Sequence, residues 1–161
     1  MPASIRGAAF TASRTLLLCA TLFASAAHMA LAQDDGVLWS RMLSLTDGRV
    51  FVTDGALTLD ASVAKPASLP TVELSPATAP IVEGYLTAEL PDEFASSELA
   101  AGERDGTYQA PSGVTLRADY VRYLRRLLSS TDLRFRMRGD NEPVVILADG
   151  SAIGLLMPVK R

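Results

Sequence analysis

TLRADYVRYLRRLLSSTDLRFRMR, residues 115–138, contains two different hydrophobic periods side by side. In its first half the apolar residues recur every three or four positions, and the remaining side of the helical projection holds Asp119, Arg122, Arg125 and Arg126. This pattern predicts an amphipathic helix over 115–129, with Thr115 as its N-cap. The apolar face is wide and needs a sheet to cover it; it consists of Leu116, Tyr120, Val121, Tyr123, Leu124, Leu127 and Leu128.

The second half, residues 133–138, alternates strictly between apolar and basic side chains. Alternation with a period of two is typical of a strand with one buried face, because successive side chains point to opposite sides of a sheet. The strand therefore has one apolar face, and its other face carries a row of arginines about 6.5–7 Å apart. That row consists of Arg134, Arg136 and Arg138.

Residues 37–61 predict a β-meander. The triplet Thr-Asp-Gly occurs at 46–48 and again at 53–55, and short runs with polar and apolar residues in alternation flank both copies. Asp-Gly suits the tight type I′ turn, in which both central residues have positive φ, so we expect the chain to turn at each copy. Phe51 is the exception, an aromatic residue where a polar one is expected. Either the meander is covered on both faces, or Phe51 belongs to a surface that meets a partner.

The rest of the chain supplies the other predicted elements. A Pro-rich connector spans 65–83, a strand is expected over 84–90, a short helix starts at 91–94, and a polar loop runs over 102–113. A hairpin turns at Asp149-Gly150. The predicted fold class is α+β, a strand-rich single domain in which one main helix packs on an antiparallel sheet with a C-terminal hairpin; 84–161 form its α+β portion.

Residues 1–32 have the layout of a secretory signal peptide. Two arginines and no acid precede an apolar run that ends in Ala30-Leu31-Ala32, which predicts cleavage near Ala32-Gln33. The alternative is a retained membrane anchor, but the strongly apolar core is shorter than the ~20 residues of a spanning helix. We therefore expect a single secreted domain over 33–161, periplasmic or extracellular, with no stable transmembrane segment.

Cleavage would remove Cys19 and His28, which are the one cysteine and the one histidine of the chain. The predicted mature chain therefore lacks disulfides, thiolate chemistry, His-ligated metals and His-dependent triads. Residues 33–115 carry thirteen acids and four bases, whereas 116–161 carry five acids and nine bases. The net negative charge of the mature chain argues against nucleic-acid binding. No cofactor and no metal is expected.

Two patterns in the sequence could support catalysis. Ser62 and Lys65 match the Ser-x-x-Lys spacing of β-lactam-binding enzymes, but Pro66 disfavours the helical conformation that this spacing needs at Lys65. Carboxylate pairs such as Asp92-Glu93 would suit glycoside hydrolysis if they converged. A small carboxylate- or Ser/Lys-dependent hydrolase acting on envelope polymers is therefore the alternative hypothesis.

The leading hypothesis is a non-enzymatic binding module of the bacterial cell envelope. An arginine-rich face would contact an envelope protein or an anionic envelope polymer, because guanidinium groups bind phosphate and carboxylate in a bidentate way. The competing interpretation is that these arginines pair with the acidic first half of the same chain. The candidate binding residues are Arg122, Arg126, Arg134, Arg136, Arg138 and Phe51.

Overall fold

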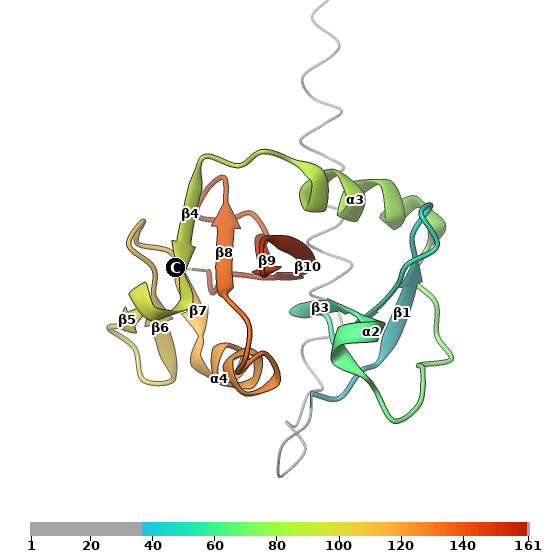
Figure 1. The fold of residues 1–161 in the computed structure, drawn as a ribbon, viewed down its shortest axis with the longest axis horizontal. Helices are drawn as coiled ribbons and strands as arrows, with labels where there is room; N and C mark the ends of the chain where they lie inside the picture. The colour runs from blue at the N-terminus through green and yellow to red at the C-terminus, as the bar shows by residue number, and fades with distance from the viewer. Residues whose placement is uncertain (1–36, 161) are drawn as a thin grey trace, which may run out of the picture.

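The computed structural model describes residues 37–160, so the predicted signal peptide lies outside the described residues. The fold is α+β, as predicted (Figure 1). Its main sheet has seven antiparallel strands in the order β1-β2-β3-β10-β9-β8-β4, and a smaller sheet has the order β5-β6-β7. The strands of the main sheet are β1 (Arg41–Ser44), β2 (Val50–Thr53), β3 (Leu57–Asp60), β4 (Asp92–Ala95), β8 (Leu133–Met137), β9 (Val144–Ala148) and β10 (Ser151–Leu156).

The predicted β-meander is confirmed. Strands β1 and β2 pair antiparallel, as do β2 and β3, and the chain turns at both Thr-Asp-Gly copies. The predicted turn type holds only at the C-terminal hairpin, where Asp149 (φ 49°) and Gly150 (φ 80°) both lie in the left-handed region. At the two earlier turns only the glycine has positive φ. Their aspartates instead use the side chain, accepting hydrogen bonds from backbone N–H groups two and three residues ahead.

Apolar side chains fill both sides of the main sheet. One side packs on α4 (Ala118–Leu127) and on the small sheet, which consists of β5 (Ala100–Ala101), β6 (Thr107–Gln109) and β7 (Thr115–Arg117). The other side packs on α3 (Ala79–Thr87). Phe51 belongs to this second cluster and is 0% exposed. The meander is thus covered on both faces, and the suggestion that Phe51 forms a binding surface is wrong.

The element that follows the small sheet is the predicted amphipathic helix, in a shorter form. Helix α4 begins at Ala118, and its first predicted turn is strand β7 instead, in which Leu116 pairs with Tyr108 of β6. Tyr120, Val121 and Leu124 are buried against the sheet, as the periodicity indicated. The alternating stretch after it forms β8, with Leu133, Phe135 and Met137 buried.

Three predicted segments differ from the structure. Residues 79–87 form helix α3 where a connector and a strand were expected, because Pro80 occupies the first turn of a helix, where its missing N–H is no loss. Residues 92–95 form strand β4, in which Phe94 stacks on Phe135 of β8 (centroids 5.5 Å apart), where a short helix was expected. The loop predicted over 102–113 contains strand β6.

Three short helices and the connector complete the described part of the fold. Helix α2 (Ala61–Ala64) follows β3. The 3-10 helix η2 (Pro76–Thr78) precedes α3, and the 3-10 helix η3 (Ser96–Glu98) follows β4. The connector runs along the outer edge of β1, where the Met42 amide donates to Val72 O and the Leu74 amide donates to Met42 O. Within 37–160 no helix has the length and apolar character needed to cross a membrane.

Candidate functional site

The row of arginines on β8 lies opposite acids of the same chain. Glu93 on β4 accepts from Arg134 Nε at 2.7 Å and from Arg136 Nε at 3.2 Å. Hydrogen bonds from Arg134, and then from Arg136, lower the pKa of Glu93. Arg138 Nε lies 3.9 Å from Glu142 Oε2. The interpretation that these three arginines are paired within the chain therefore fits their geometry.

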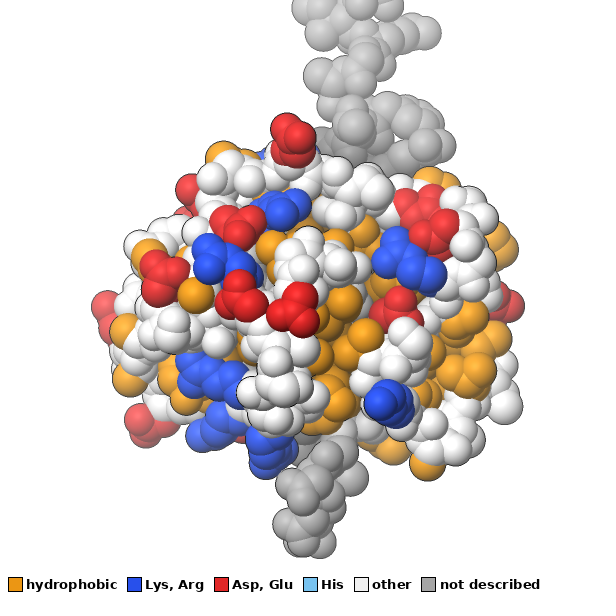
Figure 2. Space-filling model, viewed as in Figure 1, with side chains coloured by type: hydrophobic (Ala, Val, Ile, Leu, Met, Phe, Trp, Pro, Cys, Tyr) orange, Lys and Arg blue, Asp and Glu red, His pale blue; other side chains and the backbone are white. Residues whose placement is uncertain are grey.

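Arginines of helix α4 and of the position just before it form a second group. We call Arg117, Arg122 and Arg126, together with Asp119, the α4 surface. Asp119 accepts from Arg122 at 2.9 Å and from Arg117 at 3.3 Å, and these contacts lower its pKa, Arg122 having the larger effect. It is the one acidic residue of α4, so the surface has an excess of positive charge. Figure 2 shows basic side chains gathered at the lower left, over the position of α4 in Figure 1.

The fourth arginine of this region has a structural role. The Arg125 guanidinium donates to the carbonyl oxygen of Ser96 and lies 5.0 Å from the centroid of the Tyr108 ring. It thereby connects α4 to η3 and to the small sheet. Arg122, in contrast, keeps 57% of its side chain exposed.

An aromatic and apolar strip borders the α4 surface. Trp39 and Tyr123 meet edge to face with centroids 6.4 Å apart, and both are half-buried against the core. Leu127 lies one helical turn beyond Tyr123 and is also partly exposed, and Leu38 is 56% exposed. We call Leu38, Trp39, Tyr123 and Leu127 the aromatic edge. The sequence showed the aromatic and apolar residues but gave no sign that positions 39 and 123 meet.

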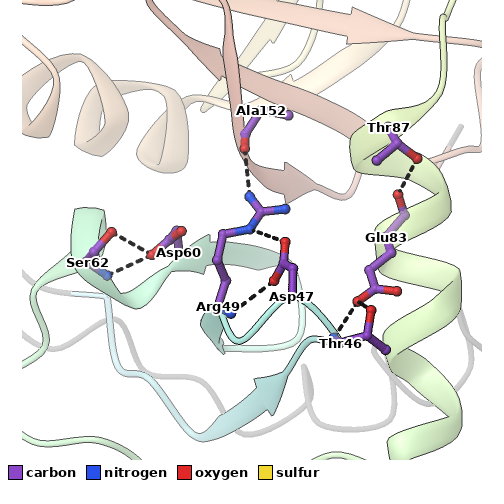
Figure 3. A network of polar contacts seen from close by, with 8 residues as sticks. All are labelled: Thr46, Asp47, Arg49, Asp60, Ser62, Glu83, Thr87 and Ala152. Carbon is purple, nitrogen blue, oxygen red and sulfur yellow. Dashed lines mark hydrogen bonds and ion pairs between the residues drawn. The ribbon is translucent and has the colours of Figure 1, made fainter.

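The candidate Ser-x-x-Lys motif does not have the arrangement that its chemistry requires. Ser62 donates both its amide and its hydroxyl to Asp60 Oδ1, at 2.9 and 2.7 Å (Figure 3). Lys65 ends α2 in the left-handed conformation, with φ 47°. Asp60 is thus the N-cap of α2, and the Ser62 hydroxyl donates to the carboxylate of that cap.

The candidate carboxylate pair Asp92-Glu93 does not converge. Asp92 and Glu93 are neighbours on β4, so their side chains point to opposite sides of the sheet, and Glu93 is held by the β8 arginines. Glu103 lies in a cleft of about 230 Å³ beside the C-terminal tail, and two basic residues, Arg104 and Lys160, share the lining with it. The cleft is lined by Glu103, Arg104, Gln109, Thr115, Val159 and Lys160. Among residues 37–160 no group of three His, Cys, Asp or Glu is placed to hold a metal ion.

One buried polar contact was not foreseen from the sequence. Asp54, in the second Thr-Asp-Gly turn, is 0% exposed and accepts a hydrogen bond from the Tyr120 hydroxyl at 2.8 Å. Burial, followed by the negative charge of Asp54 and this hydrogen bond, raises the pKa of Tyr120. The contact joins the meander to α4 and so helps to hold the α4 surface in place.

Comparison of the whole chain with protein-family models, with curated proteins and with solved structures finds no match.

Proposed function

We propose that this protein is a non-enzymatic binding module of the bacterial cell envelope, secreted or periplasmic, that contacts an anionic partner through the α4 surface. The observation that supports this most directly is the imbalance of charge on α4. Arg117, which directly precedes the helix, and Arg122 and Arg126 of α4 outnumber Asp119, the one acidic residue of the helix, and Asp119 contacts Arg117 and Arg122. Arg134 and Arg136 of β8, in contrast, share Glu93, and Arg138 lies beside Glu142. The proposal therefore keeps Arg122 and Arg126 as binding residues and leaves out Arg134, Arg136, Arg138 and Phe51.

The position of these arginines suits recognition of an anion. Arg122 and Arg126 are four residues apart on a helix, so their side chains project from the same side about one turn apart. Each guanidinium can donate two parallel hydrogen bonds to a phosphate or carboxylate. The Tyr120–Asp54 contact and the buried face of α4 hold the helix against the sheet, which limits the conformational entropy lost on binding.

The test measures binding of residues 33–161 to polyphosphate, a soluble anionic polymer, by calorimetry at low and at high salt. The double variant Arg122→Gln/Arg126→Gln is expected to bind about tenfold or more weakly, since each charged contact contributes about 1 kcal/mol or more. Binding by the unchanged protein should weaken with salt, because exposed charges are screened.

The control variant Arg138→Gln/Lys65→Gln removes the same charge from other exposed sites. Arg138 matches Arg122 well, since 57% of each side chain is exposed. The control is expected to bind polyphosphate nearly as well as the unchanged protein. Equal weakening in both variants would mean that net charge alone matters, and no binding by the unchanged protein would remove the proposal.

A further inference from the structure

We propose that the anionic partner is the headgroup layer of a phospholipid bilayer, met by the α4 surface together with the aromatic edge. This inference rests on the proposed function and names the kind of partner. A soluble anion requires only the arginines. The structure adds Trp39 and Tyr123 beside them, with Leu127 one turn further along α4 and the exposed Leu38 next to Trp39 in the chain.

The chemistry of the two neighbouring groups matches the two zones of a membrane surface. Tryptophan and tyrosine concentrate at the boundary between headgroups and acyl chains, because an apolar ring with a polar atom suits both zones. Arginines beside them can reach the lipid phosphates while their aliphatic stems stay in apolar surroundings. Tyr123 and Leu127 lie on α4 beside Arg122 and Arg126, and Trp39 contacts Tyr123, so both zones can be met at once.

The course of the chain favours a membrane over a soluble polymer. The described residues begin at Val37, two positions before Trp39, so the apolar N-terminal sequence joins the domain beside α4. Residues 33–36 lie between the expected cleavage position and Val37, and four residues span at most about 14 Å. Before cleavage, a signal segment held in the membrane would therefore keep this side of the domain close to the lipid surface.

Binding of this kind is weak and reversible, and the arginines contribute a measurable part of the binding free energy. One basic side chain near an anionic membrane contributes about a fivefold factor in partitioning, so removing two should reduce it by roughly 25-fold. The spacer contains Asp34 and Asp35, which lie outside the described residues and oppose the arginines in charge. The test therefore uses the chain from residue 33, in which both are present.

The experiment uses vesicles of mixed phosphatidylglycerol and phosphatidylcholine, vesicles of phosphatidylcholine alone, and polyphosphate. Trp39 is the one tryptophan of the chain, so its fluorescence reports directly on the aromatic edge. We expect a blue shift and co-sedimentation with the anionic vesicles and neither with the neutral ones. Arg122→Gln/Arg126→Gln should partition roughly 25-fold less, and Arg138→Gln/Lys65→Gln should change partitioning little.

A further variant tests the apolar part of the surface. Leu38→Ser alters an exposed side chain and keeps Trp39 as the probe, and it should weaken partitioning several-fold. Far-ultraviolet circular dichroism checks that each variant is folded.

The outcomes separate the two proposals. Binding to polyphosphate without binding to anionic vesicles overturns the membrane inference and leaves the proposed function standing. Binding to neither overturns both. Equal partitioning into neutral vesicles, or sedimentation with no change in Trp39 fluorescence, also overturns the inference, because the contact would then not involve this charge or this edge.

Discussion

The two Thr-Asp-Gly turns have the same three residues and opposite environments. In the first, Asp47 is exposed and accepts from the backbone amide and the guanidinium of Arg49, two residues ahead (Figure 3). In the second, Asp54 is fully buried and accepts from the amides of Ala56 and Leu57. It also accepts from Tyr120, a residue 66 positions away in the sequence.

The threonines differ in the same way. Thr46 donates its amide and hydroxyl to Glu83 of α3 at 2.5 and 2.6 Å, in an exposed contact with one residue (Figure 3). Thr53 is buried, and its hydroxyl donates to Leu57 O and accepts from Gly55 and Thr58. The comparison teaches that the triplet determines where the chain turns, whereas its contribution to stability depends on whether the fold buries the turn and on which residues contact it.

The largest expected difference between the turns is in their aspartates. Asp54→Ala leaves two backbone amides and the Tyr120 hydroxyl buried without an acceptor, and each orphaned group costs about 1–3 kcal/mol. We expect the free energy of unfolding, measured in urea, to fall by about 3–5 kcal/mol. Asp47→Ala should lower it by about 1 kcal/mol or less, since exposed ion pairs contribute little.

Asp54→Asn provides the control for the loss of side-chain volume. Its amide oxygen can still accept from Ala56 and Leu57, so it should recover part of the stability lost in Asp54→Ala. Equal losses for Asp47→Ala and Asp54→Ala would contradict the contrast between the two turns.

The next largest effect is expected at Tyr120. Tyr120→Phe keeps the ring and leaves Asp54 Oδ2 without its donor, which should reduce the free energy of unfolding by about 1–3 kcal/mol at neutral pH. Tyr123→Phe, which alters the neighbouring tyrosine at the rim of the core, is the matched control and should cost less.

The same variant makes a prediction on pH. The pKa of Tyr120 is raised in the folded protein, so the stabilisation is complete below the ordinary pKa of 10.0 and is lost as the pH rises above it. The Tyr120→Phe variant has no ionisable hydroxyl at this position. The stability gap between the two proteins should therefore narrow as urea unfolding is repeated from about pH 8 to about pH 11. A gap that stays constant over this range would contradict the proposed contact.

A smaller effect is expected at Thr46. Thr46→Ala removes the hydrogen bond from the Thr46 hydroxyl to Glu83 of α3 and keeps the one from the backbone amide, and because this contact is exposed the loss should cost about 0.5–1 kcal/mol. Thr53→Ala, measured in the same urea series, should cost more, since its hydroxyl takes part in three buried hydrogen bonds. The reverse order would indicate that α3 depends on the first turn.

The smallest effect concerns a titration. The backbone amide of Arg49, followed by its side chain, lowers the pKa of Asp47. In Arg49→Gln the amide remains, so NMR titration should show the pKa of Asp47 moving only part of the way back towards its ordinary value. Arg41→Gln, on the neighbouring strand, should leave it unchanged.

Much of this fold could be predicted from local patterns. The meander, β8 and the C-terminal hairpin follow from alternation and from Asp-Gly turns, and most of α4 follows from its helical period. Helix α3 could not be predicted, because Pro80 resembles the proline-rich connector before it and Gly84 interrupts the helical pattern. Strand β4 resembles a helix start in sequence, and its pairing with β8 through Phe94 and Glu93 decides the outcome.

The candidate site was predictable only in part. The sequence showed that arginines gather between positions 117 and 138, but it could not separate those that contact Glu93 from the others. That division depends on Glu93, which is more than forty positions from Arg134 and Arg136 and reaches them only because β4 lies beside β8. The Trp39–Tyr123 contact is equally non-local.

The connector along β1 bears on how the protein avoids unwanted assembly. An open edge strand can pair with a strand of another molecule, and prolines, which lack an N–H, discourage this. At one end of the main sheet, β1 is bordered by a segment bracketed by Pro70 and Pro76. At the other, β4 is short and acidic, and the amide of Ala95 donates to Glu98. Both ends of the sheet are thus poor templates for strand addition, which disfavours edge-to-edge pairing between two copies of the folded protein.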